Sequence, residues 1–414
     1  MSGITSLVIS RFAPDRAAGG AALRNQQNIR ALARLGPVDV LSIGEDVQAA
    51  TAVEGVREWR HICLPARTDR WQAKFAARRW WLSRDDHPLM DRYDVAEARR
   101  WLDDRLRRMA YHWVVVEELA LARYAELCRK RHCRVVFDAH NVEGTLRAAM
   151  ASAGARQDPL RRWEARTLAE RLGREERRAI GHADLVWACS ARDARELAAL
   201  YGANPVVVPN GVDVGGYRPS LEPAGDWTDK PVTLVFIGSF NYLPNEDAAL
   251  RLIREVLPAV RHRRPDARLA LVGRGPTAAM HAAAAGDPGI VISGPVASVL
   301  PYLHREAVSV VPLTLGSGTR LKILEAFAAG SPVVSSSKGA EGIDARDGCQ
   351  LLVRDDPAAM AAAVITLWDD SELRNRLVAS ALELVESHYS WSAAATRIAA
   401  SLGGPVKKGS VLPV

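Results

Sequence analysis

The sequence predicts an α/β protein of two doubly wound, Rossmann-like domains. Short apolar runs alternate with longer amphipathic segments along most of the 414 residues, which is the pattern of βαβ units. The pattern breaks over residues 215–230, where Gly, Pro and Asp cluster without periodicity, as they do in linkers. The chain is also too long for one ordinary hydrophobic core. We therefore expect one domain on each side of residues 215–230.

The N-terminal domain, residues 1–214, is expected to contain six parallel strands. Their continuous apolar character indicates strands that are covered on both faces of the sheet. A long charged helix is expected over residues 161–181, ending at a glycine. The strands are expected at residues 6–10, 38–43, 112–118, 134–140, 184–190 and 204–210.

The C-terminal domain, residues 231–386, repeats this organisation, and residues 387–414 are expected to form a C-terminal helix and tail. Helices are expected over residues 247–263, 319–329 and 369–386. The strands are expected at residues 232–239, 267–273, 290–295, 308–313, 331–336 and 349–353.

Composition narrows the class of protein. No stretch approaches the roughly 20 consecutive apolar residues of a membrane span, and the first residues resemble a β-strand more than a signal peptide. The five cysteines are scattered without metal-ligand spacing, and no Asp-x-Asp or His/carboxylate motif occurs. We therefore predict a cytoplasmic protein with reduced thiols, no bound metal and no cofactor.

The net charge of +7 is concentrated in residues 1–220, while residues 221–414 are close to neutral. This asymmetry favours an acidic partner, either a lipid surface, a phosphate-linked acceptor or nucleic acid, although an Arg-rich composition explains it equally well. Residues 70–84 interleave cations with aromatic side chains, which suits the interface of an anionic membrane. A buried aromatic helix with one basic face is the alternative. We predict peripheral association with the inner face of the cell membrane, and no nucleic acid.

Residues 311–336 contain the most informative motif. A strand is followed by a glycine-rich loop at Gly316, Ser317, Gly318 and Thr319, and then by a helix. The free N–H groups and the positive end of the helix dipole favour a phosphate at such a loop.

Two charged residues of this helix, Lys322 and Glu325, fall on the side opposite its apolar face. A cation in the first turn can meet a phosphate, and a carboxylate one turn later can accept hydrogen bonds from ribose hydroxyls. A solvated Lys–Glu pair on an exposed helix face is the alternative interpretation.

These segments together resemble glycosyltransferase family 4, the group 1 glycosyltransferases. The resemblance rests on the order and spacing of Gly19 and Gly20, residues 138–143, 208–213, 236–239 and 271–276, and the motif at 311–336. It implies the GT-B fold, with an acceptor-side N-terminal domain facing a donor-binding C-terminal domain across a cleft. It also implies a retaining, metal-independent hexosyltransferase that moves a sugar from a nucleotide-diphosphate sugar, as co-substrate, to a glycan, lipid-linked or other glycoconjugate acceptor in polysaccharide biosynthesis.

The resemblance also assigns roles to residues. Glu325 matches the second glutamate of the family's E-x7-E motif, which binds the donor ribose, and His140 matches the histidine that faces the donor sugar and phosphate. Gly19 and Gly20 match the loop whose backbone approaches the diphosphate. The further donor-binding positions are Gly238, Ser239, Gly273, Val296, Gly316, Ser317, Gly318 and Thr319.

The sequence departs from the family pattern at two places. Ser317 stands where many members have the first glutamate, and residues 238–245 lack the cations that usually neutralise the diphosphate. We expect Arg320 and Lys322 to replace them, and we count both with His140 and Glu325 as the catalytic group. Because of these departures two alternative functions stay open, a GT-B-fold nucleotide-sugar epimerase and a non-catalytic nucleotide-sugar-binding protein.

Overall fold

The computed structural model describes residues 3–13, 19–45, 55–65, 88–154, 159–217, 231–303, 307–316 and 320–403. Residues 70–84 and most of the expected linker lie outside this part of the chain. The chain divides into two compact units, the first made of Met1–Pro209 with Ala394–Val414 and the second of Asn210–Ala393.

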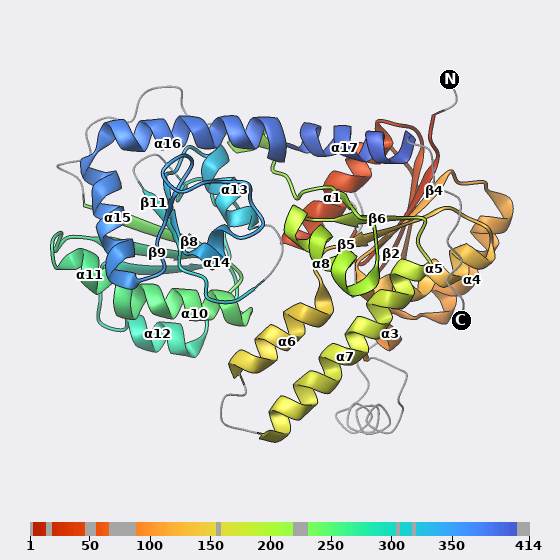
Figure 1. Cartoon of the computed structure of the whole chain (residues 1–414), viewed down its shortest axis with the longest axis horizontal. Coiled ribbons are helices and arrows are strands. Elements are labelled where there is room, and N and C mark those ends of the chain that lie inside the picture. Colours follow the sequence, from red (N-terminus) through yellow and green to blue (C-terminus); the bar gives the residue numbers. More distant parts are fainter. Residues whose placement is uncertain are drawn as a thin grey trace. The chain divides into compact units, whose positions relative to one another are not determined.

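Unit 1 contains a parallel sheet of seven strands in the order β3-β2-β1-β4-β5-β6-β7 (Figure 1). All six expected strands are present, and β3 is an additional one. The bounds are β1 (Ser6–Ser10), β2 (Val38–Gly44), β3 (Val56–Cys63), β4 (Trp113–Glu117), β5 (Val135–Ala139), β6 (Leu185–Ala188) and β7 (Val206–Val207).

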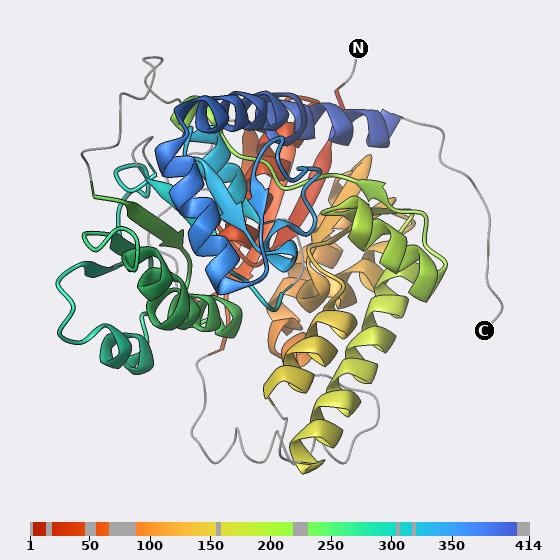
Figure 2. The same ribbon diagram turned by 60° about the vertical axis from the view of Figure 1, so that its left-hand side comes forward.

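Helices cover both faces of this sheet. Ile29 and Leu32 of α1 and Ile398 and Leu402 of α17 pack on one face, while α4 and α5 pack on the other. Helices α6 and α7 lie side by side as a pair (Figures 1 and 2). The bounds are α1 (Gly20–Ala33), α3 (Pro88–Tyr93), α4 (Ala96–Arg108), η1 (Leu119–Leu121), α5 (Ala122–Lys130), α6 (Glu143–Gly154), α7 (Pro159–Gly181), α8 (Ala191–Tyr201) and α17 (Trp391–Gly403).

Unit 2 contains a parallel sheet of six strands in the order β10-β9-β8-β11-β12-β13. All six strands correspond to expected ones, although β13 is shorter than its apolar run. The bounds are β8 (Thr233–Ile237), β9 (Arg268–Val272), β10 (Ile290–Gly294), β11 (Val308–Val311), β12 (Val333–Ser335) and β13 (Leu352–Val353).

The three helices expected in unit 2 are present with changed ends. The first begins earlier than expected, at Leu243, because Pro244 suits a first helical turn, and π-helical turns interrupt or end two of the helices. The bounds are α9 (Val214–Tyr217), α10 (Leu243–Arg251), η2 (Leu252–Val256), α11 (Leu257–Arg261), α12 (Ala278–Ala284), α13 (Leu321–Ala328), α14 (Ser337–Ala340), α15 (Pro357–Asp369), α16 (Ser371–Leu384) and η3 (Val385–Tyr389).

Helix α13 carries the predicted charged pair on a firmly anchored element. Its Ile323, Leu324 and Phe327 are buried in the core of unit 2. At its end Gly330 has a φ of 71°, and the N–H of Ser331 reaches the carbonyl of Ala326 at 2.9 Å, which is the Schellman arrangement. The charged residues therefore project from a helix whose position is set by its apolar face.

Each sheet has a topological switch point, where consecutive connections leave in opposite directions. It lies between β1 and β4 in unit 1 and between β8 and β11 in unit 2. In open α/β sheets, ligands bind beside the carboxyl ends of the strands at such points. The two doubly wound domains confirm the predicted fold class. No helix in the described ranges combines the length and apolar character of a membrane span.

Candidate functional site

At the switch point of unit 2 the loops after β8 and β9 are in backbone contact. The N–H of Gly238 donates to the carbonyl of Val272 at 3.0 Å. Gly273 has a φ of 139°, and a Cβ atom there would lie 1.9 Å from the carbonyl oxygen of Gly238. Only glycine fits this position, so the two loops can lie close together and expose backbone to a ligand.

Side chains tie the same loops together. The guanidinium Nε of Arg274 donates to Oγ of Ser239 at 3.0 Å, and the N–H of Phe240 donates to the carbonyl of Arg274 at 2.9 Å. The N–H of Gly273 reaches Oγ of Ser293 on β10 at 3.3 Å. Of the predicted positions, Gly238, Ser239 and Gly273 thus lie together, while Val296 packs partly buried against the core.

Lys322 of α13 contacts the first turn of α10 and the strand β8. Its Nζ donates to Oδ1 of Asn245 at 2.6 Å and lies 4.1 Å from the centre of the Phe236 ring. Burial, and then the positive charge of Arg320, lowers the pKa of Lys322 to about 7. Asn245 belongs to the stretch that lacks the family's usual cations, and Lys322 brings a cation to it from the neighbouring helix.

Glu325 lies one turn further along α13 and is partly buried. Its Oε1 accepts a hydrogen bond of 2.9 Å from the hydroxyl of Tyr217 on α9. Burial raises the pKa of Glu325, against the opposing effect of this hydrogen bond and of Lys322. Lys322 and Glu325 thus bind separate partners, and the described contacts include no ion pair between them. The arrangement differs from a solvated pair on an exposed helix face.

Arg320 immediately precedes α13 and is buried. Its guanidinium lies against Gly316, where a Cβ atom would come within 3.0 Å of both terminal nitrogens. Gly316 has a φ of 118°, so glycine is favoured there for conformation as well as for space. Arg320 therefore packs against Gly316, the first residue of the glycine-rich segment. Ser317, Gly318 and Thr319 lie outside the described residues.

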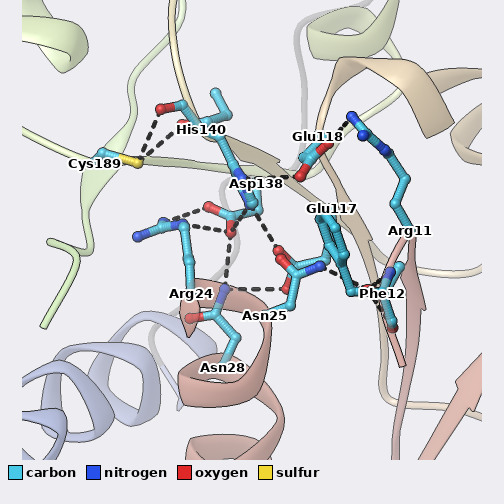
Figure 3. A network of polar contacts seen from close by, with 12 residues as sticks. Arg11, Phe12, Arg24, Asn25, Asn28, Glu117, Glu118, Asp138, His140 and Cys189 are labelled. Atoms are coloured by element: carbon cyan, nitrogen blue, oxygen red, sulfur yellow. Dashed lines mark hydrogen bonds and ion pairs between the residues drawn. The ribbon is translucent and has the colours of Figure 1, made fainter. Parts of the chain in front are cut away.

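His140 follows β5 in unit 1 and has carboxylates at both ring nitrogens (Figure 3). Nε2 lies 2.9 Å from Oε2 of Glu117 and 3.3 Å from Oδ2 of Asp138, and Nδ1 lies 3.3 Å from Oε1 of Glu118. Burial opposes the positive charge, but hydrogen bonds to these carboxylates raise the pKa of His140 well above its usual value. The carboxylates around the ring thus favour its protonated form.

Arg24 of α1 holds Asp138 from the other side. Its Nε donates to Oδ2 at 2.7 Å, its Nη2 donates to Oδ1, and its Nη1 donates to the carbonyl of Val208 at 2.8 Å. Burial alone would raise the pKa of Asp138, but Arg24 and then His140 hold it well below the usual range. Asn28, one turn later, donates to Asp138 at 2.8 Å and to Glu117 at 3.1 Å.

The pKa values of the two adjacent glutamates of this cluster are shifted in opposite directions. Burial, followed by the charge of Asp138, raises the pKa of Glu117 to about 7. The pKa of Glu118 is lowered despite its burial, because His140 and Arg11 favour the ionised form. Nη1 of Arg11 donates to Oε2 of Glu118 at 2.7 Å. Glu118 is thus a carboxylate fixed between two cations.

Glu117, Asp138 and His140 bring ligand atoms of metal-binding types within 4.8 Å of one another, a grouping that the sequence analysis did not anticipate. The guanidinium of Arg24 donates to both oxygens of Asp138, and the Glu117 oxygens contact Asn28 and His140. These residues do not fit a metal ion, because the carboxylate oxygens already have partners in the protein and the charge of Asp138 is compensated by Arg24. The absence of a metal stays a prediction.

Gly19 and Gly20 begin the helix that carries Arg24 and Asn28. Gly19 has a φ of 110°, and its carbonyl accepts the N–H of Leu23 at 3.0 Å. The polar run of α1 from Arg24 to Asn28 is entirely buried, which the sequence analysis missed. The sequence does contain a signal for this cluster, because a continuous polar run lies inside an otherwise apolar helix. A pair of glutamates also lies at the end of a predicted strand elsewhere in the chain.

Two protein-family models match this chain, one in each half of the sequence. Residues 18–215 match the model described as Glycosyltransferase Family 4, and residues 231–370 match the model described as Glycosyl transferases group 1. A phosphatidyl-myo-inositol mannosyltransferase of Mycobacterium leprae is 31% identical over 48% of this chain and 53% of its own length. A D-inositol 3-phosphate glycosyltransferase of Kineococcus radiotolerans is 30% identical over 53% of this chain and 57% of its own length. The chain thus spans about half the length of these relatives.

Solved structures share the fold across nearly the whole chain. A sucrose-phosphate synthase from Thermosynechococcus elongatus superposes with a TM-score of 0.72 at 17% identity, covering 96% of this chain and 98% of that one. Anabaena HepE, solved with UDP and glucose, superposes with a TM-score of 0.63 at 13% identity, covering 96% and 99%. Together with the motifs and the two doubly wound sheets, these matches show that the chain belongs to glycosyltransferase family 4, the group 1 glycosyltransferases, and has the GT-B fold.

Proposed function

We propose that the protein transfers a sugar from a nucleotide-diphosphate sugar to a hydroxyl of a glycan, lipid-linked or other glycoconjugate acceptor, with retention of configuration and without a metal. The observation that carries the proposal is the pair Lys322 and Glu325 at the switch point of unit 2. Lys322 lies at Asn245, in the stretch that lacks the usual phosphate-binding cations. A cation and a carboxylate one turn apart suit the diphosphate and the ribose of one donor molecule.

In this proposal Lys322 exchanges Asn245 for the diphosphate. The cation then stabilises the negative charge that develops on the leaving nucleoside diphosphate. Arg320, packed against Gly316, adds positive charge. Glu325 accepts hydrogen bonds from the ribose hydroxyls in place of, or beside, the hydroxyl of Tyr217.

His140 is proposed to act on the sugar side of the reaction as a positively charged group. The support is its carboxylate-bound ring at the carboxyl end of β5, together with its match to the family's histidine. None of the described side chains is assigned as a nucleophile. The retaining outcome is proposed on family membership.

The acceptor is proposed to be a polyhydroxylated molecule. It can carry phosphate groups, because unit 1 contains most of the positive charge of the chain and that charge attracts phosphate. The curated relatives are named for inositol-containing acceptors, so phosphatidylinositol and inositol 3-phosphate belong in the first acceptor panel. The peripheral membrane association predicted from residues 70–84 remains a proposal, since these residues lie outside the described ranges.

The test begins with a thermal-shift panel of nucleotide-diphosphate sugars, because a ligand that binds only the folded state raises the melting temperature. The donor with the largest shift is then incubated with the acceptor panel, with and without EDTA, and the product is identified by NMR. We expect transfer only in the presence of an acceptor, an unchanged anomeric configuration and full activity in EDTA.

Other outcomes identify the rivals. A converted sugar in the absence of any acceptor would indicate an epimerase. Tight donor binding without turnover on any acceptor would indicate a binding protein. Activity lost in EDTA and restored by Mg²⁺ or Mn²⁺ would contradict metal independence.

A further inference from the structure

Glu118 has a backbone conformation that is nearly restricted to glycine. Its φ is 68° and its ψ is 153°. Among the described residues other than glycine, only Glu118 and His132 have a positive φ. A side chain in this region of backbone space is strained, and such strain persists only where the surrounding structure holds it. Strained residues of this kind cluster at functional sites.

The strained turn brings two consecutive side chains to one ring. Along a strand, successive side chains point to opposite faces of the sheet, so two neighbours on an extended β4 could not both reach His140. Strand β4 ends at Glu117, and the turn at Glu118 redirects the second carboxylate. As a result Glu117 lies at Nε2 of His140 and Glu118 lies at Nδ1 (Figure 3).

Glu118 is also anchored at its other oxygen. Nη1 of Arg11 donates to it at 2.7 Å, and the guanidinium of Arg11 lies 4.9 Å from the centre of the Tyr93 ring and 5.4 Å from that of Phe12. Arg11 follows β1 and Glu118 follows β4, so this ion pair lies at the switch point of the unit 1 sheet. It connects the switch point directly to His140.

We propose that Glu118 is a positioning residue, held in a glycine-like conformation so that its carboxylate fixes the His140 ring and keeps both ring nitrogens protonated during glycosyl transfer. The catalytic role of Glu118 in this proposal depends on the proposed glycosyltransferase function. It adds a residue and a charge state that the family resemblance does not assign. His140 then acts as a permanent imidazolium and not as a general base.

Two ionised carboxylates among the described residues that face His140 favour this charge state. Asp138 is bound by Arg24, and Glu118 lies between His140 and Arg11, so a carboxylate oxygen lies 3.3 Å from each ring nitrogen. Burial raises the pKa of the neighbouring Cys189 thiol to about 12, and this neutral thiol donates to the carbonyl of His140 at 3.3 Å. Glu117 is the remaining titratable neighbour.

The first experiment measures the His140 ring by NMR in the full-length protein, with the wild type compared to Glu118→Gln. The amide keeps the length of the side chain and removes its charge. We expect the His140 pKa to fall by at least one unit, and the ring to lose its protonated Nδ1 signal at a lower pH than in the wild type. Arg11→Gln, which removes a competing cation and leaves the Glu118 carboxylate, is the second variant and should raise the His140 pKa.

An unchanged His140 pKa in both variants overturns the proposal. This measurement requires no turnover, so it separates the two ideas. If the protein transfers no sugar but the His140 pKa responds, the proposed function fails and the positioning by Glu118 stands. Where transfer is measured, the alkaline limb of kcat should move to lower pH in Glu118→Gln, with little change in KM for the donor.

A second experiment compares stability with activity. Glu118→Gly relieves the backbone strain but leaves the partly buried Arg11 and His140 without their shared carboxylate, so it should lower Tm and also lower kcat at least tenfold. His132→Gly is the matched control, because His132 has a φ of 57° and lies on the surface just after α5. It should raise or preserve Tm with kcat unchanged. A Glu118→Gly protein with wild-type kcat would contradict the proposal.

Discussion

The ammonium group of Lys322 is placed where burial and a neighbouring guanidinium both disfavour its charge. Its pKa of about 7 lies well below that of a free lysine, and the exposed alternative of a solvated surface lysine would not produce such a shift. A diphosphate bound beside it would restore the charge. Lys322 is thus a group whose protonation should be coupled to ligand binding.

We predict that nucleoside diphosphate affinity falls as the pH rises through about 7, because the free protein then loses the Lys322 proton that binding requires. Nucleoside affinity should stay constant over the same range. Calorimetry in two buffers of different ionisation enthalpy should detect proton uptake on binding near pH 8. A diphosphate affinity independent of pH between 6 and 9 would contradict this assignment.

Glu325→Gln should change stability and binding in opposite directions. The pKa of this carboxyl is raised in the folded protein, so the ionised form costs stability at every pH above the unfolded value, and its removal should raise Tm at pH 7. Donor affinity should fall by about 1.5–3 kcal/mol, since a charged hydrogen-bond acceptor is lost.

The control for Glu325 is Tyr217→Phe, which removes the hydroxyl partner and leaves the carboxylate. It should retain most of the donor affinity, because the ribose can replace the missing hydroxyl. Unchanged donor affinity in Glu325→Gln would remove this residue from the site.

At the level of single residues, sequence spacing predicts that Lys322 and Glu325 share one helix, but it does not predict which residues surround His140. Lys322 and Glu325 lie on one local element, so helical periodicity places them together. Arg24, Glu117 and Glu118 come from α1 and the end of β4, and only the strand order brings them to His140. The resemblance identified His140 but none of the side chains that set its charge.

At the level of elements, the loops after β8 and β9 depend on a glycine. Gly273→Ala places a Cβ atom 1.9 Å from the carbonyl of Gly238, so the loops must separate. We predict that this change costs more than about 1 kcal/mol of stability and lowers nucleotide affinity at least tenfold. Denaturant unfolding and calorimetry measure the two effects.

Gly286→Ala is the matched control for that prediction. Gly286 also has a positive φ, 81°, but no atom lies within 4 Å of its added Cβ. It should cost about 1 kcal/mol or less of stability through backbone strain alone and leave nucleotide binding unchanged. Equal losses of affinity in the two variants would show that the contact with Gly238 has no role in the site.

Buried strands were predicted better than edge strands, for a physical reason. β1, β4 and β5 are covered on both faces and appear as continuous apolar runs. β3 lies at the edge of its sheet, and its Arg57, Glu58 and Arg60 are exposed, so its sequence resembles a polar loop. The helix ends also differ from the predicted ones, because caps and π-helical turns depend on tertiary packing. Sequence periodicity does not reveal this packing.

At the level of the whole molecule, the C-terminal helix shows what a domain boundary drawn from composition misses. The sequence predicts a C-terminal helix and tail over residues 387–414 and does not assign them to either domain. In the structure, Ala394–Val414 belongs to unit 1, where Ile398 and Leu402 pack with Val8 and Trp187. Truncating either side chain to alanine removes buried contacts that typically contribute about 2–5 kcal/mol. Contacts between segments that are distant in the sequence place this helix in unit 1. Amino-acid composition does not reveal such contacts.

Calorimetry on the full chain tests whether Lys322 binds a nucleoside diphosphate. Dissociation constants for UDP and GDP, and for uridine and guanosine, should be compared in the wild type, in Lys322→Ala and in Lys338→Ala. Lys338 is the matched control, a cation of unit 2 that is paired with Glu341. We predict that Lys322→Ala weakens diphosphate binding at least tenfold, about 1.4 kcal/mol, while nucleoside binding and the control stay within twofold. Equal weakening of both ligands, or no weakening of either, would contradict the account.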